Sequence, residues 1–142
     1  MPTVERSALV PYTAQQMYQL VNDVTSYPEF LPWCSGAAVL EDNDGVRVAR
    51  VDISRGPLKQ HFVTRNELIE GEEIRLNLVE GPFSQLHGQW QFISIGDSGC
   101  RVTFSTQFSF NSVLIEKTLG PVFNDICTKL VDSFVARARQ VY

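Results

Sequence analysis

The sequence has no long hydrophobic run, no paired cysteines and no excess of basic residues. A membrane-spanning helix needs about 18 or more apolar residues in a row, and none of the 142 residues belongs to such a run. Cys34, Cys100 and Cys127 lack C-x-x-C spacing, which argues against a disulfide framework or a zinc knuckle. A net charge of −4 argues against DNA binding through phosphate neutralisation. We therefore expect neither an integral membrane protein nor a DNA-binding protein.

Motifs for catalysis and metal binding are missing as well. The sequence contains no glycine-rich phosphate loop, no H-E-x-x-H pair, no calcium loop and no G-x-S-x-G turn. His61 and His87 fall on the polar phase of separate predicted strands, so we expect no shared metal. A cysteine nucleophile paired with one of them stays open as an alternative. Otherwise we predict no catalytic residue, no metal and no cofactor.

Composition and the first residues predict one domain and a location in the cytoplasm. Hydrophobic residues make up 44% and charged residues 20%, which is typical of globular proteins. No linker or repeat interrupts the chain, which predicts a single domain over residues 1–142. Residues 1–7 contain neither the apolar stretch of a secretory signal nor the Arg-rich character of a transit peptide.

A two-residue hydrophobic period marks most of the chain as antiparallel strands with one apolar face. It is clearest in residues 100–110, where Val102, Phe104 and Phe108 alternate with polar residues. The period is present in segments 58–68, 74–78 and 85–94, and is weaker in 37–40 and 46–53. Short clusters rich in Gly, Asp and Asn separate these segments and predict hairpin turns.

Helical spacing appears at two places. Thr13 and Gln16 form a predicted capping box that begins a helix, and Tyr27-Pro28 ends this helical region. Residues 119–138 carry the strongest three-and-four pattern of the chain, which predicts a long amphipathic C-terminal helix. Because proline lacks an amide hydrogen, we expect a kink at Gly120-Pro121 or a fresh helix start with Pro121 in the first turn.

These elements predict an α+β fold in the order strand, two short helices, six strands and long helix. The apolar face of the sheet needs a cover, and the C-terminal helix is available to provide it. A twisted sheet curved around one helix leaves space near its ends, which predicts a hydrophobic cavity. The pattern alone favours a packed core over a pocket for the aromatic residues on this face.

One basic segment stands out from the acidic remainder of the chain. Residues 47–65 contain five basic residues and one acidic residue, Asp52. The basic residues are Arg47, Arg50, Arg55, Lys59 and Arg65. The pattern favours solvated outer positions of two strands over a contact surface.

Four strings in order resemble the coenzyme-Q-binding branch of the START-like, polyketide-cyclase-type superfamily. They are Tyr27-Pro28-x-Phe30-Leu31-Pro32-x-Cys34, Thr64-Arg65-Asn66-x-Leu68, Leu78-Val79-x-Gly81-Pro82-Phe83-x-x-Leu86-x-Gly88-x-Trp90-x-Phe92 and Arg137-Ala138-x-x-Val141-Tyr142. Trp33 departs from the family pattern, which allows small residues there, and would narrow the mouth of a cavity. The resemblance implies a helix-grip fold and the binding of a ubiquinone-like isoprenoid in a non-enzymatic role that supports respiration.

On this hypothesis aromatic side chains form the walls of the ligand site, and Phe30, Leu31 and Trp33 form its lip. Thr64 and Asn66 would bind a quinone carbonyl, because a buried polar pair otherwise costs free energy. The full set of predicted ligand-binding residues is Phe30, Leu31, Trp33, Phe62, Thr64, Asn66, Phe83, Trp90, Phe104, Phe108 and Phe123.

Two other functions stay open. Resemblance to bacterial ribosome-association toxins of the same branch implies contact with the large ribosomal subunit and a block of subunit joining, with the basic segment 47–65 as the contact surface. Analogy within the superfamily leaves a cyclase or aromatase-like enzyme as a third hypothesis, since fold does not settle function. Because quinones reside in bilayers, transient contact with the inner membrane is expected on the first hypothesis.

Overall fold

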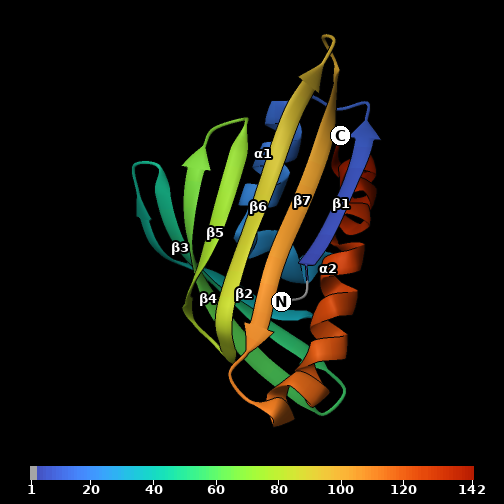
Figure 1. Ribbon diagram of the computed structural model, residues 1–142. Helices are drawn as coiled ribbons and strands as arrows, with labels where there is room; N and C mark the ends of the chain where they lie inside the picture. The colour runs from blue at the N-terminus through green and yellow to red at the C-terminus, as the bar shows by residue number, and fades with distance from the viewer. Residues whose placement is uncertain (1–2) are drawn as a thin grey trace.

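The computed structural model describes residues 3–142 as one curved antiparallel sheet packed against a long helix (Figure 1). Met1 and Pro2, at the start of the predicted domain, lie outside the described residues. The seven strands follow the order β1-β7-β6-β5-β4-β3-β2. Their bounds are β1 Thr3–Val10, β2 Cys34–Asn43, β3 Val46–Arg55, β4 Leu58–Ile69, β5 Glu73–Glu80, β6 Phe83–Ile95 and β7 Gly99–Phe110. The predicted six-strand meander is confirmed, and β1 closes it by pairing with β7.

Two short helices follow β1, as the sequence predicts. Helix α1 spans Ala14–Asn22 and the 3₁₀ helix η1 spans Val24–Glu29. The capping box is present: Gln16 donates its amide hydrogen to the Thr13 hydroxyl, and Thr13 donates its own amide hydrogen to the Gln16 side chain. These bonds satisfy two amides at the helix start that have no partner within the helix. Helix α1 packs on β6 and β7, and η1 packs on β2.

The C-terminal helix α2 spans Val113–Val141 and crosses the concave side of the sheet, in contact with β1 and β7 (Figure 1). Its predicted buried face is confirmed, but the predicted fresh start at Pro121 is wrong. The helix begins at Val113, where the Ser112 hydroxyl accepts a hydrogen bond from Ile115 N at 3.1 Å. This first turn could not be predicted from the sequence. Val113 and Leu114 are apolar but exposed, so they do not continue the helical spacing of buried residues. Pro121 lies inside the helix.

Strand register lines up inward-facing residues in rows across the sheet. Asn66 pairs with Leu76, Leu76 with Gly88 and Gly88 with Thr106. We call these four residues the small-residue row. The next row runs from Leu68 through Ile74 and Trp90 to Phe104. Except on β5, the side chains of the second row are larger than those of the first, and this difference determines where space remains beneath α2.

Candidate ligand-binding cavity

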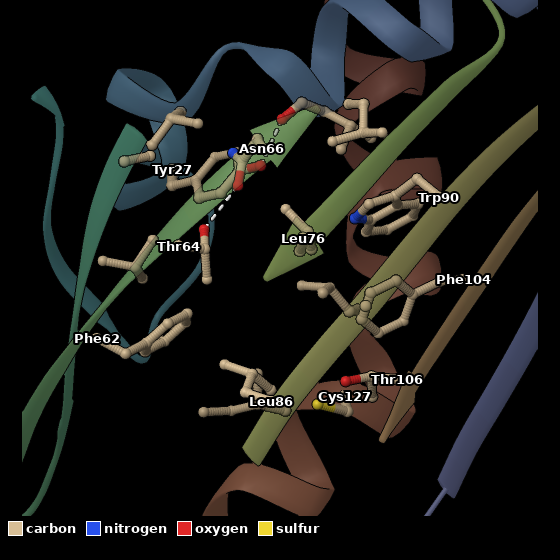
Figure 2. A pocket seen from close by; sticks show the side chains of 18 of the residues that line it. Tyr27, Phe62, Thr64, Asn66, Leu76, Leu86, Trp90, Phe104, Thr106 and Cys127 are labelled. Atoms are coloured by element: carbon tan, nitrogen blue, oxygen red, sulfur yellow. Dashed lines mark hydrogen bonds between the residues drawn. The ribbon is translucent and has the colours of Figure 1, made fainter. Parts of the chain in front are cut away.

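A cavity of about 100 Å³ lies between the concave face of the sheet, the α1–η1 segment and α2 (Figure 2). Strands β3 to β7 supply one wall, and α2 supplies the other through Phe123, Ile126, Cys127, Leu130 and Phe134. The α1–η1 segment contributes Val21, Asn22, Val24 and Tyr27. The surface of the cavity is therefore mainly hydrocarbon and aromatic, which is typical of sites for small apolar molecules.

The small-residue row explains why space remains there. Gly88 has no side chain, and Asn66 and Thr106 are shorter than the aromatic residues of the neighbouring row. Leu76 is the only large apolar side chain of the row, and a Cβ placed on Gly88 would lie 3.1 Å from Leu76 Cδ1. The pairing of β4 with β5 is irregular beside the same space: Val63 pairs with Glu80 and Thr64 with Leu78, so Val79 of β5 is the extra residue of a bulge. Bulges redirect the side chains of their strand and recur next to functional sites.

A polar pair lies in the apolar wall. Thr64 and Asn66 are 6% and 5% exposed, and the Thr64 hydroxyl donates to Asn66 Oδ1 at 2.7 Å (Figure 2). Across the cavity, the Thr106 hydroxyl donates to the His87 carbonyl at 2.9 Å. Both hydroxyl hydrogens are thus used within the protein, as expected of buried polar groups.

The groups that line the cavity are poorly suited to acid–base or nucleophilic chemistry. No Asp, Glu, His, Lys or Arg of the described chain is among the lining residues. Burial raises the pKa of the Cys127 thiol to about 12, so this cysteine stays protonated and non-nucleophilic at neutral pH. Burial also raises the pKa of Tyr27, whose hydroxyl donates to the Val21 carbonyl. All three cysteines are free and buried.

Most of the predicted ligand-binding residues lie around the cavity. Those that line it are Trp33, Phe62, Thr64, Asn66, Trp90, Phe104 and Phe123. Trp33 is only partly buried, and its place in a lip stays a prediction.

Four predicted residues do not line it. Leu31 is completely buried in a separate cluster with Val24 and Cys34, and so does not form a lip. Phe30 packs on Phe134, and the Arg137 guanidinium carbon lies 4.9 Å from the centroid of the Phe30 ring. Phe83 and Phe108 pack on Phe123 with ring centroids 4.9 Å away, outside the cavity lining. Strand phase identifies inward-facing residues, but it does not separate cavity walls from packed core.

Several lining residues were missed by the sequence analysis. They come from the α1–η1 segment, from strands β3, β5, β6 and β7, and from α2, namely Val21, Asn22, Val24, Tyr27, Ala49, Val51, Ile74, Leu76, Leu86, Gly88, Thr106, Ile126, Cys127, Leu130 and Phe134. Their inward phase was visible in the sequence. Only strand register, however, shows that Asn66, Gly88 and Thr106 fall in one row.

The basic segment divides between two faces of the sheet. Arg47 lies on the inward phase and donates to the Asn22 carbonyl at 2.7 Å, and Arg55 pairs with Asp125 of α2 at 3.1 Å. Arg50, Lys59 and Arg65 lie on the outer phase and are exposed. Arg50 pairs with Asp52 and Arg65 with Glu67, which leaves Lys59 without an ion pair among residues 3–142. Three of the five residues therefore share a surface, which neighbouring acids partly neutralise.

Residues 3–142 contain neither a cluster of metal-ligating side chains nor a helix able to span a membrane. No group of three or more His, Cys, Asp or Glu side chains there is arranged to hold a metal ion. His61 bonds Glu80 at 2.9 Å and His87 bonds Asn77 at 3.0 Å, both at exposed positions. In the same part of the chain, no helix has the length and hydropathy needed to cross a bilayer.

Comparisons with known proteins agree with this architecture. The chain is 46% identical over 142 residues to the ribosome association toxin RatA of Escherichia coli, covering 100% of this chain and 90% of that protein. It is 29% identical over 141 residues to the mitochondrial coenzyme Q-binding protein COQ10 homolog B of Xenopus laevis, covering 96% of this chain and 57% of that one.

A solved structure supports the same fold. The Zhui aromatase/cyclase of Streptomyces superposes with a TM-score of 0.86 over 98% of this chain and 94% of that one, at 15% identity. This likeness supports the helix-grip fold alone. Residues 10–135 match the family model described as polyketide cyclase / dehydrase and lipid transport. With this match over most of its length, the chain belongs to that START-like family.

Proposed function

We propose that the protein binds a ubiquinone-like isoprenoid quinone beneath α2 and serves as a non-enzymatic carrier or chaperone that supports respiration. The observation that carries this proposal is an apolar cavity with one buried amide in its wall, that of Asn66. A hydrophobic ring with a carbonyl group matches both properties. The relative named as a coenzyme Q-binding protein supports the same ligand class.

The size of the cavity adds a condition. Ligand pockets usually measure roughly 300–1,000 Å³, whereas this cavity measures about 100 Å³. An engineered apolar cavity of about 150 Å³ accepts benzene. A quinone ring and its tail therefore require the walls to separate, and we propose that Trp33, a partly exposed lining residue, moves as the tail leaves toward solvent or a bilayer. We also propose that the protein works in the cytoplasm, with transient contacts at the inner membrane.

Native mass spectrometry of the protein purified from its own host tests this proposal, followed by organic extraction of any bound lipid. We expect a stoichiometric quinone on the wild type. Gly88→Val, which fills the cavity from the sheet, should lose the quinone, whereas the exposed substitution Gln91→Ala should keep it. A wild-type protein that carries no quinone and takes up none from ubiquinone-loaded vesicles would overturn the proposal.

The names of the relatives favour a second candidate function, association with the large ribosomal subunit that blocks subunit joining. The E. coli protein called a ribosome association toxin matches the whole chain at 46% identity. The surface we propose for this contact is formed by Arg50, Lys59 and Arg65 on the outer face of β3 and β4. Nucleic-acid phosphates attract such groups, with a strong dependence on salt.

Sedimentation with purified large ribosomal subunits tests the second candidate. The double variant Arg50→Glu/Lys59→Glu should weaken co-sedimentation and flatten its salt dependence. Arg6→Glu/Arg101→Glu, an equal charge change at exposed positions of β1 and β7, is the matched control and should leave co-sedimentation intact. Unchanged co-sedimentation of the Arg50→Glu/Lys59→Glu variant would exclude this surface as the site of ribosome contact. The cyclase-like alternative receives no support from the lining residues, and we propose no catalytic step.

A further inference from the structure

Two hydrogen-bond donors in the cavity have no partner within the protein. The Asn66 side chain uses Oδ1 to accept from Thr64, so its amide nitrogen keeps both hydrogens. Trp90 is 3% exposed, and its indole nitrogen makes no hydrogen bond with residues 3–142. Neither this nitrogen nor that of Asn66 is among the fully enclosed polar atoms without a partner, so both reach open space. Figure 2 shows the indole nitrogen directed toward the space beside Leu76. Trp90 therefore directs an unused N–H group into the cavity, and the unused N–H groups of Asn66 lie in its wall.

Unused donors in such a place have an energetic consequence. A polar group that is cut off from water and left without a partner is destabilising, and native proteins rarely leave one unsatisfied. The cavity is mainly hydrocarbon, so few alternative partners lie nearby. When an apolar ligand displaces water from the cavity, both donors therefore need an acceptor that the ligand supplies.

Strand register places the donors on either side of one strand. Asn66 lies on β4 and Trp90 on β6, with β5 between them, so roughly 10 Å separates their strands. Leu76 of β5 lies between the two side chains (Figure 2). A flat ring resting on Leu76 would thus have one edge toward the Asn66 amide and another toward the Trp90 indole.

We propose that Asn66 and Trp90 form a two-donor site that selects the oxidised, carbonyl-bearing quinone over its hydroquinone. This inference rests on the proposed quinone-binding function and deepens it. A quinone carbonyl only accepts hydrogen bonds, which suits two N–H donors. A hydroquinone hydroxyl must also donate its own hydrogen, and two donors facing it leave that hydrogen without a partner.

The side chains near the site differ in whether they can accept a hydrogen bond from a hydroquinone hydroxyl. Thr64 Oγ1 and Thr106 Oγ1 keep lone pairs, although their hydrogens are used for Asn66 and the His87 carbonyl. The Thr64–Asn66 bond can reverse, which would turn Asn66 Oδ1 toward the ligand. An indole nitrogen cannot accept in any orientation. Trp90 is therefore the residue that fixes the preference for the oxidised ring.

Anaerobic equilibrium dialysis against ubiquinone-1, ubiquinol-1 and prenylbenzene tests the inference. We expect the wild type to bind ubiquinone-1 about tenfold more tightly than ubiquinol-1, since one unpaired buried donor is worth about that factor. Trp90→Phe keeps a flat apolar ring and removes the N–H, so the preference should fall toward unity. Phe104→Leu replaces the ring whose centroid lies 4.5 Å from that of Trp90 and removes no hydrogen-bond donor. It should therefore weaken the binding of both forms equally.

The outcomes separate this inference from the function on which it rests. Equal affinity of the wild type for ubiquinone-1 and ubiquinol-1 overturns the selectivity and leaves quinone binding standing. Binding of neither form above prenylbenzene overturns the proposed quinone function itself. If Trp90→Phe fails to fold by circular dichroism, Trp90→Tyr keeps a large ring and offers a hydroxyl that can also accept, so it should lower the preference in the same way. The double variant Thr64→Val/Asn66→Leu leaves the Trp90 donor in place, so it should weaken ubiquinone-1 binding and keep a preference for the oxidised form. An unchanged preference in a folded Trp90 variant counts against the two-donor site.

Discussion

The concave face of the sheet holds both the small-residue row and three closely packed rings, Phe83, Phe108 and Phe110, which with Phe123 of α2 form the aromatic cluster. The row borders open space, whereas these three rings of the sheet lie outside the cavity lining. In the cluster, ring centroids lie 4.9 to 5.1 Å apart for Phe83 with Phe110, Phe83 with Phe123 and Phe108 with Phe123. In the row, short side chains leave about 100 Å³ beneath α2. One part of the interior is therefore closely packed, and another part is left open.

This difference predicts opposite responses to substitution. Where packing is complete, removal of atoms leaves an unfilled cavity and costs stability. Where space already exists, added atoms fill it at little cost and exclude a ligand. Four measurements test this contrast, in order of decreasing effect.

Removal of a ring from the aromatic cluster should have the largest effect. Phe108 is 1% exposed and packs against Phe110 and Phe123. Phe108→Ala should lower the free energy of unfolding by about 3–5 kcal/mol, measured by urea denaturation. Phe108→Leu, as the matched control, should lose clearly less. Equal losses for the two variants would show that the cluster is not closely packed.

The polar pair in the cavity wall should respond next. Thr64→Val removes the hydrogen that Asn66 Oδ1 accepts, which should cost about 1–3 kcal/mol in urea denaturation. Thr64→Val/Asn66→Leu replaces both partners with apolar groups and should return close to wild-type stability. If the double variant is as unstable as the single one, the pair stabilises the fold by more than satisfying its own buried polar groups.

A methyl group added to the small-residue row should stabilise the fold slightly. Gly88→Ala places its Cβ 3.1 Å from Leu76 Cδ1, the mobile end of a flexible side chain. The reduced entropy of the unfolded chain should raise the free energy of unfolding by about 0.4–1 kcal/mol. Gly81→Ala is the contrasting control, because Gly81 has φ 151° and its added Cβ would lie 2.9 Å from Phe62 Cβ. A destabilised Gly88→Ala would mean that the row is already closely packed.

The smallest effect concerns the ion pairs that hold α2 to the rim of the sheet. Hydrogen bonds from Lys129 and Arg55 hold the pKa of the Asp125 carboxyl below its usual value. Because the folded pKa is lowered, the stabilisation is complete above the ordinary Asp pKa of about 3.9 and is lost as pH falls through the lowered value. Thermal melts of the wild type and Asp125→Asn should differ slightly at neutral pH and converge in acid. A difference that persists in acid would contradict this origin.

Much of the fold could be predicted from local patterns. The alternation of Val102, Phe104 and Phe108 identified a strand and its inner face, and the Thr13–Gln16 capping box identified the start of α1. The start of α2 could not be predicted in the same way. Val113 and Leu114 are exposed apolar residues, so their helical turn leaves no amphipathic pattern in the sequence.

The site was predicted less completely because it depends on contacts between distant segments. Thr64 and Asn66 were recognisable as polar residues on an inward phase, and the structure places both in the cavity wall. Leu31 and Phe108 carried the same apolar signal as the lining residues, but the structure buries them in packed clusters. Burial alone therefore could not distinguish a wall from a core.

The sequence by itself determined which residues form strands and which face of each strand is apolar, because side-chain direction alternates along a strand whatever its neighbours are. Tertiary structure decided how those strands align. Strand register brought Asn66, Leu76, Gly88 and Thr106 into one row and left the cavity above them. It also set Asn66 and Trp90 on either side of β5, because only pairing between strands fixes which residues lie opposite one another.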